Sequence, residues 1–276
     1  MICLVSHDVG GAELLSCWSR NSKKKFLYCI KGPAIKIFKR NIKNFKNTSI
    51  QNIKRKTTKI ITSTSKESDH EIKYLKYGIK KKIKTISLLD HWVNYKNRFI
   101  RNKKIILPYE LWVTNEFAYN IAKKNFDLKI LKKKNYYLED FFKNYKKEQA
   151  DYENKFALYV SSTTKNLNHD KKRLLYFLKF KDFFKKKNLK ILIKLHPAES
   201  KKKYYWLKKN FSKDVLLDNK SDLKDLLLKS KYVIGCNSMA MVVALHLNKK
   251  VFNGFPPGQD KNQLPFKNIK KLKFIK

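Results

Sequence analysis

Two short polar turns, each placed directly after an apolar run, carry the clearest chemical signal in the sequence. His196 and Pro197 follow residues 191–195, and residues 235–238 follow residues 232–234. Apolar runs of this length, bounded by turn residues, are typical of buried strands. Open α/β sheets bind ligands beyond the carboxyl ends of their strands, and a helix that begins there offers unpaired N–H groups to an anion. We therefore expect a phosphate or nucleotide site in this half of the chain.

The residue types in these two turns suit phosphate binding. An imidazole such as His196 can donate a hydrogen bond to a phosphate or sugar oxygen, and Pro197 fixes the turn and removes a competing N–H. Ser238 can cap the following helix or donate to a phosphate, and the N–H groups from Asn237 to Met239 would complete the cradle. An unliganded tight turn is the alternative for His196, and a simple helix cap is the alternative for Ser238.

The first half of the chain has a candidate catalytic turn after the apolar residues 1–6. His7 and Asp8 are followed by Gly10 and Gly11, which permit a tight turn and a close backbone approach. His7 could act as a general base oriented by Asp8, or Asp8 could act directly. Loop polarity without a catalytic role is the alternative, since two adjacent glycines are not a full dinucleotide fingerprint.

Two further groups of polar residues follow predicted strands. Asp90 and His91, followed by Trp92, suit contact with a sugar through its hydroxyls and through an indole face. A structural contact between the acid and the imidazole is the alternative. Ser161 and Ser162 follow the first predicted strand of the second half, where their hydroxyls could contact a diphosphate, and an ordinary Ser/Thr loop is the alternative.

The elements that would position these turns alternate between strand and helix along the whole chain. Strands are predicted at residues 1–6, 25–30, 58–64, 84–89, 110–114, 129–131, 156–161, 191–195, 214–217, 232–234 and 251–252. Helices are predicted at 13–20, 34–40, 69–82, 116–125, 170–186, 201–210, 221–228 and 239–246. Such alternation indicates parallel sheets joined by right-handed crossovers. We expect two Rossmann-like α/β domains, 1–145 and 146–276, with the boundary in the polar stretch 139–155.

The composition is strongly basic, with 65 Lys and Arg residues against 22 Asp and Glu and a formal net charge of +43. Lysine dominates, Asn and Ile are abundant, and there are only 7 Gly and 6 Pro. A base-composition bias of the gene explains this pattern better than a dedicated nucleic-acid surface, because the lysines are spread along the chain. We expect no specific nucleic-acid partner, only a salt-dependent attraction to polyanions and anionic membranes.

The four cysteines lack Cys-x-x-Cys spacing and lie in apolar runs or a predicted helix. Buried free thiols in a reducing compartment fit this pattern best. With no secretory signal and no stretch of about 18 apolar residues, we expect a cytoplasmic protein, with or without peripheral contact at the inner membrane face. Acidic residues are scarce and no His/Cys spacing suggests zinc, so we expect neither a metal site nor a bound cofactor.

The order and spacing of the two turns in the second half resemble the HP and S motifs of bacterial sialyltransferases and polysialyltransferases. The general layout is similar to GT-B-type glycosyltransferases, capsule-polysaccharide transferases, CDP-glycerol glycerophosphotransferases and UDP-N-acetylglucosamine 2-epimerases. In the sialyltransferases, the motif histidine contacts the nucleotide phosphate and the serine motif binds the same group, which implies these roles for His196, Pro197 and Ser238. The resemblance also implies two domains that face an interdomain cleft. The acidic-acidic-Gly motif of those enzymes is missing, and residues 7–11 stand in a comparable place.

The resemblance implies a metal-independent glycosyltransferase that moves a sugar from a nucleotide sugar to a surface-glycan, polysaccharide or lipid-linked acceptor. One alternative is an enzyme similar to the UDP-N-acetylglucosamine 2-epimerases, which would require several carboxylates in the cleft. A second alternative is a degenerate transferase that binds polyanions without catalysis.

Overall fold

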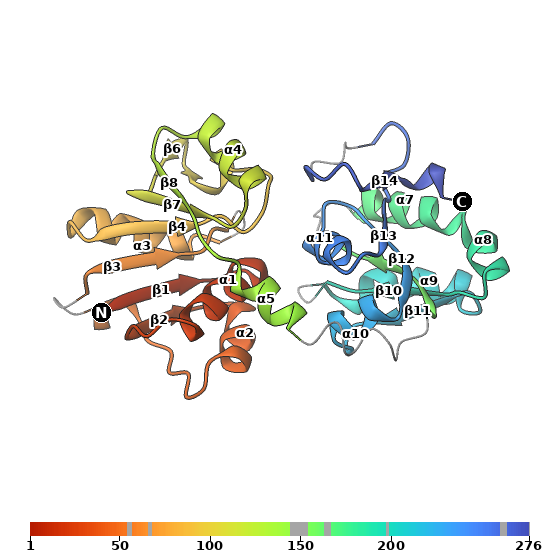
Figure 1. Cartoon of the computed structure of the whole chain (residues 1–276), viewed down its shortest axis with the longest axis horizontal. Helices are drawn as coiled ribbons and strands as arrows, with labels where there is room; N and C mark the ends of the chain where they lie inside the picture. The colour runs from red at the N-terminus through yellow and green to blue at the C-terminus, as the bar shows by residue number, and fades with distance from the viewer. Residues whose placement is uncertain are drawn as a thin grey trace. The chain divides into compact units, whose positions relative to one another are not determined.

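The computed structural model describes residues 1–53, 57–65, 68–143, 154–162, 167–196, 199–259 and 264–275. The chain divides into two compact units, Met1–Lys143 (unit 1) and Asn144–Lys276 (unit 2). The predicted domain boundary after residue 145 lies outside the described residues. Each unit is an α/β fold built on one six-stranded parallel sheet (Figure 1).

The sheet of unit 1 has the strand order β2-β1-β3-β4-β7-β8. Its strands are β1 (Ile2–Ser6), β2 (Phe26–Ile30), β3 (Lys59–Thr62), β4 (Lys84–Leu88), β7 (Glu110–Val113) and β8 (Lys129–Lys132). Successive side chains of β1 point to opposite faces of the sheet. Ile2 and Leu4 join one apolar cluster, and Cys3 and Val5 join another. Because both faces are covered, the strand reads as a continuous apolar run.

Helices and a small hairpin complete unit 1. Helices α1 (Val9–Arg20) and α2 (Ala34–Asn41) supply the first cluster, and α3 (His70–Lys80) supplies part of the second. Helices α4 (Glu116–Asn125) and α5 (Tyr136–Phe142) flank β8, and η1 (Ile50–Asn52) and η2 (Lys96–Arg98) are single 3₁₀ turns. Strands β5 (Ile100–Arg101) and β6 (Lys104–Ile105) pair antiparallel outside the main sheet.

The sheet of unit 2 has the order β11-β10-β9-β12-β13-β14. Its strands are β9 (Phe156–Val160), β10 (Lys190–Lys194), β11 (Val215–Asp218), β12 (Ser230–Gly235), β13 (Lys250–Asn253) and β14 (Lys270–Lys271). The connecting elements are α7 (Leu167–Leu178), α8 (Lys181–Lys186), η4 (Lys201–Tyr204), α9 (Tyr205–Phe211), α10 (Leu223–Leu228), α11 (Met239–His246) and η5 (Leu272–Phe274). The core of one face includes Tyr159, Ile193 and Ile234 from the strands and Phe177 and Phe184 from α7 and α8.

Several elements differ from the sequence prediction. Helix α1 begins at Val9 rather than at residue 13, so Gly10 and Gly11 lie in its first turn instead of in the predicted tight turn before the helix. The predicted helix 170–186 is two helices, α7 and α8, separated by a turn in which Phe180 N donates to Phe177 O at 3.1 Å. The hairpin β5–β6, helix α5 and the edge strand β14 were not predicted.

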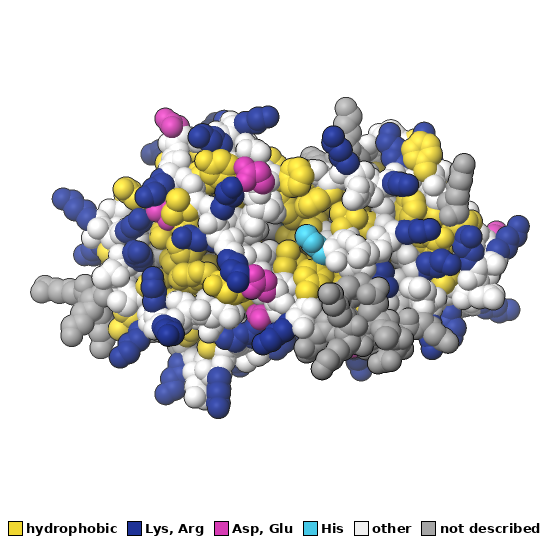
Figure 2. Space-filling model, in the orientation of Figure 1, with side chains coloured by type: hydrophobic (Ala, Val, Ile, Leu, Met, Phe, Trp, Pro, Cys, Tyr) yellow, Lys and Arg dark blue, Asp and Glu magenta, His cyan; other side chains and the backbone are white. Residues whose placement is uncertain are grey.

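The distribution of basic side chains and the state of the cysteines agree with the predictions made from the composition. Lysine and arginine side chains are spread over the face of the molecule shown in Figure 2 rather than gathered in one patch. All four cysteines are buried free thiols. Within the described ranges, no helix combines the length and the hydropathy that crossing a membrane requires.

Candidate functional site

The two turns of unit 2 lie at the same edge of its sheet. Val160, the last residue of β9, pairs with Lys194 of β10 on one side and with Gly235 of β12 on the other. The turns that follow β10 and β12 therefore leave the carboxyl edge two strand spacings apart, roughly 10 Å. The point where the strand order reverses falls between β9 and β12, which is where parallel sheets bind ligands.

The β12–α11 turn is shaped for an anion. Asn237 adopts the left-handed conformation (φ 55°), a region that Asn tolerates better than most residues. Ser238 is the N-cap of α11, and its Oγ accepts from Ala240 N at 3.3 Å. Asn237, Ser238 and Met239 are half-buried, and the first turn of α11 contains no acidic residue. The hydroxyl proton of Ser238 and the helix N-terminus thus suit a phosphate oxygen.

The turn after β10 is fixed by hydrogen bonds to a buried carboxylate, Glu199, which was not predicted from the sequence. The backbone N of half-buried His196 donates to Ser161 Oγ at 2.8 Å, and Ser161 Oγ in turn donates to Glu199. Glu199 also accepts from Tyr204 Oη at 2.9 Å and pairs with Lys203. Ser161, predicted to contact a diphosphate, is buried and uses its hydroxyl to fix this turn.

The charges around Glu199 balance within unit 2. Lys203 pairs with both Glu199 and Asp170, and Arg173 lies 3.5 Å from Asp170. Burial alone would raise the pKa of Glu199, but hydrogen bonds from Lys203, Ser161 and Tyr204 lower it below its usual value. Burial raises the pKa of Asp170 against the opposing effect of Lys203.

Two other predictions in this part of unit 2 have separate outcomes. Pro197 lies outside the described residues, and Ser162 is half-buried at the end of β9.

The Arg173 guanidinium lies 4.7 Å from the ring of Phe255, so α7 packs against the turn that follows β13.

The His7–Asp8 pair of unit 1 lies at the carboxyl end of β1. His7 Nδ1 and Asp8 Oδ1 are 2.8 Å apart, and their side chains are 29% and 36% exposed. Gly32 adopts a left-handed conformation (φ 57°) beside the imidazole, where an added Cβ would overlap the ring. The pair therefore has the contact expected of a base and its orienting carboxylate, and both side chains are partly exposed.

Behind this pair lies a buried carboxyl group, Glu71, that the sequence analysis also missed. Glu71 Oε1 accepts from His7 N at 2.8 Å and from Ser63 Oγ at 2.9 Å, and Ser6 Oγ lies 2.8 Å from Ser63 Oγ. Glu71 Oε2 is buried and has no hydrogen-bond partner. Burial, with the nearby Asp8 carboxylate, raises the pKa of Glu71 to about 7.

Asp90 forms an ion pair with Arg98 at this edge. Arg98 Nη1 donates to Asp90 Oδ1 at 2.8 Å and to Thr64 Oγ1 at 2.9 Å, and both charged side chains are almost fully covered. An added Cβ on Gly10 would overlap Asp90 Oδ2, and one on Gly11 would overlap Ser63. The two glycines therefore allow α1 to pack closely on the ends of β3 and β4, which explains why glycine occupies these two positions of the helix.

His91 and Trp92 are arranged differently from the expected sugar contact. His91 Nδ1 accepts from the backbone N of Trp92, and the two rings are 5.6 Å apart. Trp92 is 6% exposed and its indole N–H donates to Asn115, the N-cap of α4. Little of the indole face is open to a sugar, because the ring packs in the core of unit 1.

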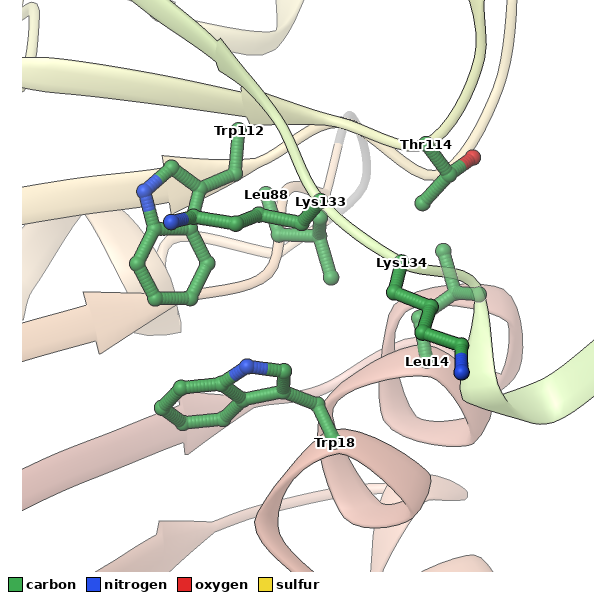
Figure 3. A pocket seen from close by; sticks show the side chains of 7 residues that line it. All are labelled: Leu14, Trp18, Leu88, Trp112, Thr114, Lys133 and Lys134. Atoms are coloured by element: carbon green, nitrogen blue, oxygen red, sulfur yellow. The ribbon is translucent and has the colours of Figure 1, made fainter. Parts of the chain in front are cut away.

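Unit 1 also contains a small pocket between α1 and the ends of β4 and β7 (Figure 3). It encloses about 240 Å³, open solvent at its mouth included, and is lined by Leu14, Trp18, Leu88, Trp112, Thr114, Lys133 and Lys134. Trp18 and Trp112 meet edge to face at 5.0 Å, and the Lys133 ammonium lies 4.7 Å from the Trp112 ring. None of the predicted site residues lines this pocket.

In the described part of both units, no group of three or more His, Cys, Asp or Glu side chains is placed to hold a metal ion.

Comparison with known proteins places the fold. No protein-family model and no curated protein sequence matches the chain. The UDP-GlcNAc 2-epimerase of Neisseria meningitidis bound to UDP-GlcNAc matches 96% of this chain and 84% of its own (TM-score 0.66, 13% identity). The UDP-GlcNAc 2-epimerase of Methanocaldococcus jannaschii in complex with UDP-GlcNAc and UDP matches 91% and 83% (TM-score 0.65, 12% identity).

A more distant match is the H444N variant of the wall teichoic acid polymerase TagF, which covers 92% of this chain and 69% of its own (TM-score 0.51, 12% identity). At these identities the likeness concerns the fold. The fold is the GT-B architecture, in which each half is a Rossmann-like α/β unit, and the likeness does not indicate a particular family such as the sialyltransferases.

Proposed function

We propose that this protein binds a nucleotide sugar through unit 2 and transfers the sugar to a glycan or lipid-linked acceptor without a metal ion. The observation that carries the proposal is the position of the His196 and Ser238 turns on one carboxyl edge, on either side of the point where strand order reverses. The solved structures of similar fold include complexes with UDP-GlcNAc and UDP.

In this proposal the diphosphate lies between the two turns. The helix N-terminus of α11 and the Ser238 hydroxyl bind one phosphate, and the His196 imidazole donates to the other. As the sugar bond breaks, negative charge grows on the departing phosphate, and fixed donors stabilise that charge. Unit 1 supplies the His7–Asp8 pair as base for the acceptor hydroxyl: His7 Nδ1–H donates a hydrogen bond to Asp8, and Nε2 accepts the substrate proton.

Isothermal titration calorimetry with UDP, CDP, CMP and UDP-GlcNAc tests the nucleotide site. We expect saturable binding with a preference among nucleotides, and a loss of roughly tenfold to hundredfold in affinity in His196→Ala, because a hydrogen bond to a charged group is removed. His169→Ala, an exposed histidine of α7 in the same unit, is the matched control and should bind like the wild type.

A different pattern would reject the nucleotide site. Binding that is equal for all nucleotides and for heparin, that weakens steeply with salt and that is unchanged in His196→Ala would favour the polyanion-binding alternative.

A second candidate reaction is 2-epimerisation of UDP-N-acetylglucosamine. The specific observation in its favour is that Asp8, Glu71 and Asp90 all lie at the carboxyl ends of β1, β3 and β4 or on the helices beside them, although acidic residues are scarce in the chain. Epimerisation at C2 removes and returns a proton, which carboxyl groups can do as general base and general acid.

Incubation with UDP-GlcNAc in D₂O, followed by NMR, separates the two reactions. An epimerase forms the C2 epimer without any acceptor and introduces deuterium at C2. A transferase leaves C2 protonated and releases UDP faster when an acceptor sugar is added.

A further inference from the structure

Both units hold a site histidine in the same way. In unit 2, His196 N donates to Ser161 Oγ, and Ser161 Oγ donates to Glu199. In unit 1, His7 N and Ser63 Oγ both donate to Glu71. Each glutamate comes from the segment after a strand and reaches the backbone of a histidine at the end of a strand. We refer to these arrangements as the Glu199 clamp and the Glu71 clamp.

The two clamps differ in the charged groups around the glutamate. Glu199 pairs with Lys203, accepts from Tyr204, and lies in a network where Lys203 and Arg173 balance Asp170 and Glu199. A cation and several donors therefore favour its charged form.

Glu71 accepts hydrogen bonds from Ser63 and from the backbone of His7, but no salt bridge to a Lys or Arg is found for it among the described residues. Its ionisable neighbours are Asp8 and His7 on the β1–α1 turn and His70 on its own helix. Burial lowers the pKa of His70, so it brings no positive charge near neutral pH, and Asp8 repels a second carboxylate. Glu71 Oε1 accepts both of these hydrogen bonds, whereas the buried Oε2 has no partner, so no donor offsets a negative charge on Oε2 and burial disfavours the charged form.

We infer that Glu199 and Glu71 are the positioning residues of His196 and His7, and that Glu199 acts as a carboxylate whereas Glu71 acts as a neutral carboxylic acid. The inference rests on the proposed function for the roles of the two histidines. Neither glutamate has to touch a ligand: each fixes the backbone from which an imidazole projects. The unit 1 turn is consequently sensitive to pH near neutrality, and the unit 2 turn is not.

The same substitution at both positions tests the inference, because Gln mimics a protonated Glu and cannot replace a carboxylate. Hydrogen exchange of the full-length protein, followed by mass spectrometry at pH 6, 7 and 8 and corrected for intrinsic rates, reports on peptides that contain His7 and His196. In Glu199→Gln we expect exchange at the His196 turn to rise about tenfold or more. In Glu71→Gln we expect the protection of the His7 turn at pH 6 to be kept.

The pH dependence distinguishes a Glu71 that ionises near neutral pH from one that supports the turn without changing its protonation state. In the wild type, the His7 turn should lose protection between pH 6 and pH 8 as Glu71 ionises, and Glu71→Gln should abolish this step. His7 and Asp8 remain in that variant, so a step that persists belongs to them. Glu116→Gln, an exposed acid at the start of α4, is the control that should change neither turn.

Several results would overturn the inference. They are a pH step that survives in Glu71→Gln, a loosening of the His7 turn by Glu71→Gln at pH 6, or a His196 turn unaffected by Glu199→Gln. Calorimetry with the preferred nucleotide adds an independent readout: Glu199→Gln should weaken binding and Glu71→Gln should not. If the wild type binds no nucleotide, the proposed function fails, while the exchange result still decides the positioning roles.

Discussion

The carboxyl group of Glu71 links the stability of unit 1 to pH. Its pKa rises from an ordinary value of 4.5 to about 7 on folding, chiefly because the group is buried. A raised pKa means that the folded chain holds the proton more tightly than the unfolded chain does. The contribution to the unfolding free energy is therefore fully present below pH 4.5 and is lost as pH rises through about 7.

We predict that Glu71→Gln removes this dependence. Urea denaturation measures the unfolding free energy at pH values from 5 to 8. Across that range, the value for the variant should rise relative to the wild type by up to about 3 kcal/mol. Glu199→Gln supplies the contrast, since the lowered pKa of Glu199 stabilises the fold above pH 4.5 and that contribution is lost as pH falls through the folded pKa. A parallel pH profile for the wild type and Glu71→Gln would show that Glu71 is ionised throughout.

Residue types at strand ends could be predicted, but the groups that hold them could not. His7, Asp8, Asp90, His196 and Ser238 were identified because each follows an apolar run. Glu71 binds His7 and Ser63, and Glu199 binds Ser161, all of which other strands bring to them, so the sequence near each glutamate does not reveal these partners. One signal was available: Glu71 lies on the apolar face of α3, in register with Tyr74, Leu75 and Gly78, where a carboxyl group is out of place.

At the scale of elements, Gly32 shows how one turn controls the His7 imidazole. Gly32 and Gly258 both have positive φ, but an added Cβ would overlap His7 at the first and meet nothing within 4 Å at the second. We predict that Gly32→Ala and Gly258→Ala each lose about 1–2 kcal/mol of unfolding free energy, because L-residues are strained in the left-handed region. Only Gly32→Ala should also change the NMR chemical shifts of the His7 ring, and equal changes in both variants would contradict the packing role.

The order of strands and helices was largely predictable, because buried parallel strands are short apolar runs and the helices between them have amphipathic spacing. Helix α11 was predicted at its observed bounds, residues 239–246. The hairpin β5–β6 and the edge strand β14 were missed, since two-residue strands carry no periodicity. The start of α1 was misplaced because glycines were interpreted as a turn, whereas close packing on Asp90 and Ser63 explains them.

At the scale of the whole molecule, the net charge of +43 predicts nonspecific association with polyanions. We expect binding to heparin and to DNA of any sequence, with an affinity that falls steeply as salt increases, because counterion release drives it. Fluorescence anisotropy with two unrelated DNA duplexes between 50 and about 200 mM salt measures this. A large preference for one duplex, or an affinity insensitive to salt, would instead indicate a dedicated nucleic-acid surface.

The order of strands in the two sheets could not be predicted from the sequence. Alternating strands predicted parallel sheets, but the two sheets differ in order: β3 follows directly beside β1 in unit 1, whereas β10 and β11 lie on one side of β9 in unit 2. This difference sets where each reversal of strand order falls and hence which turns meet. Apolar runs of similar length give no information on which strands pair with each other in the sheet.

The indole pair of the small pocket has an optical consequence. Trp18 and Trp112 lie 5.0 Å apart with their planes inclined by 62°, so their electronic transitions couple and should give a strong near-ultraviolet circular dichroism signal. Both rings belong to the first half of the chain, and of the four tryptophans only Trp206 belongs to the second. Loss of that signal during heating therefore follows the melting of one half alone, without any label.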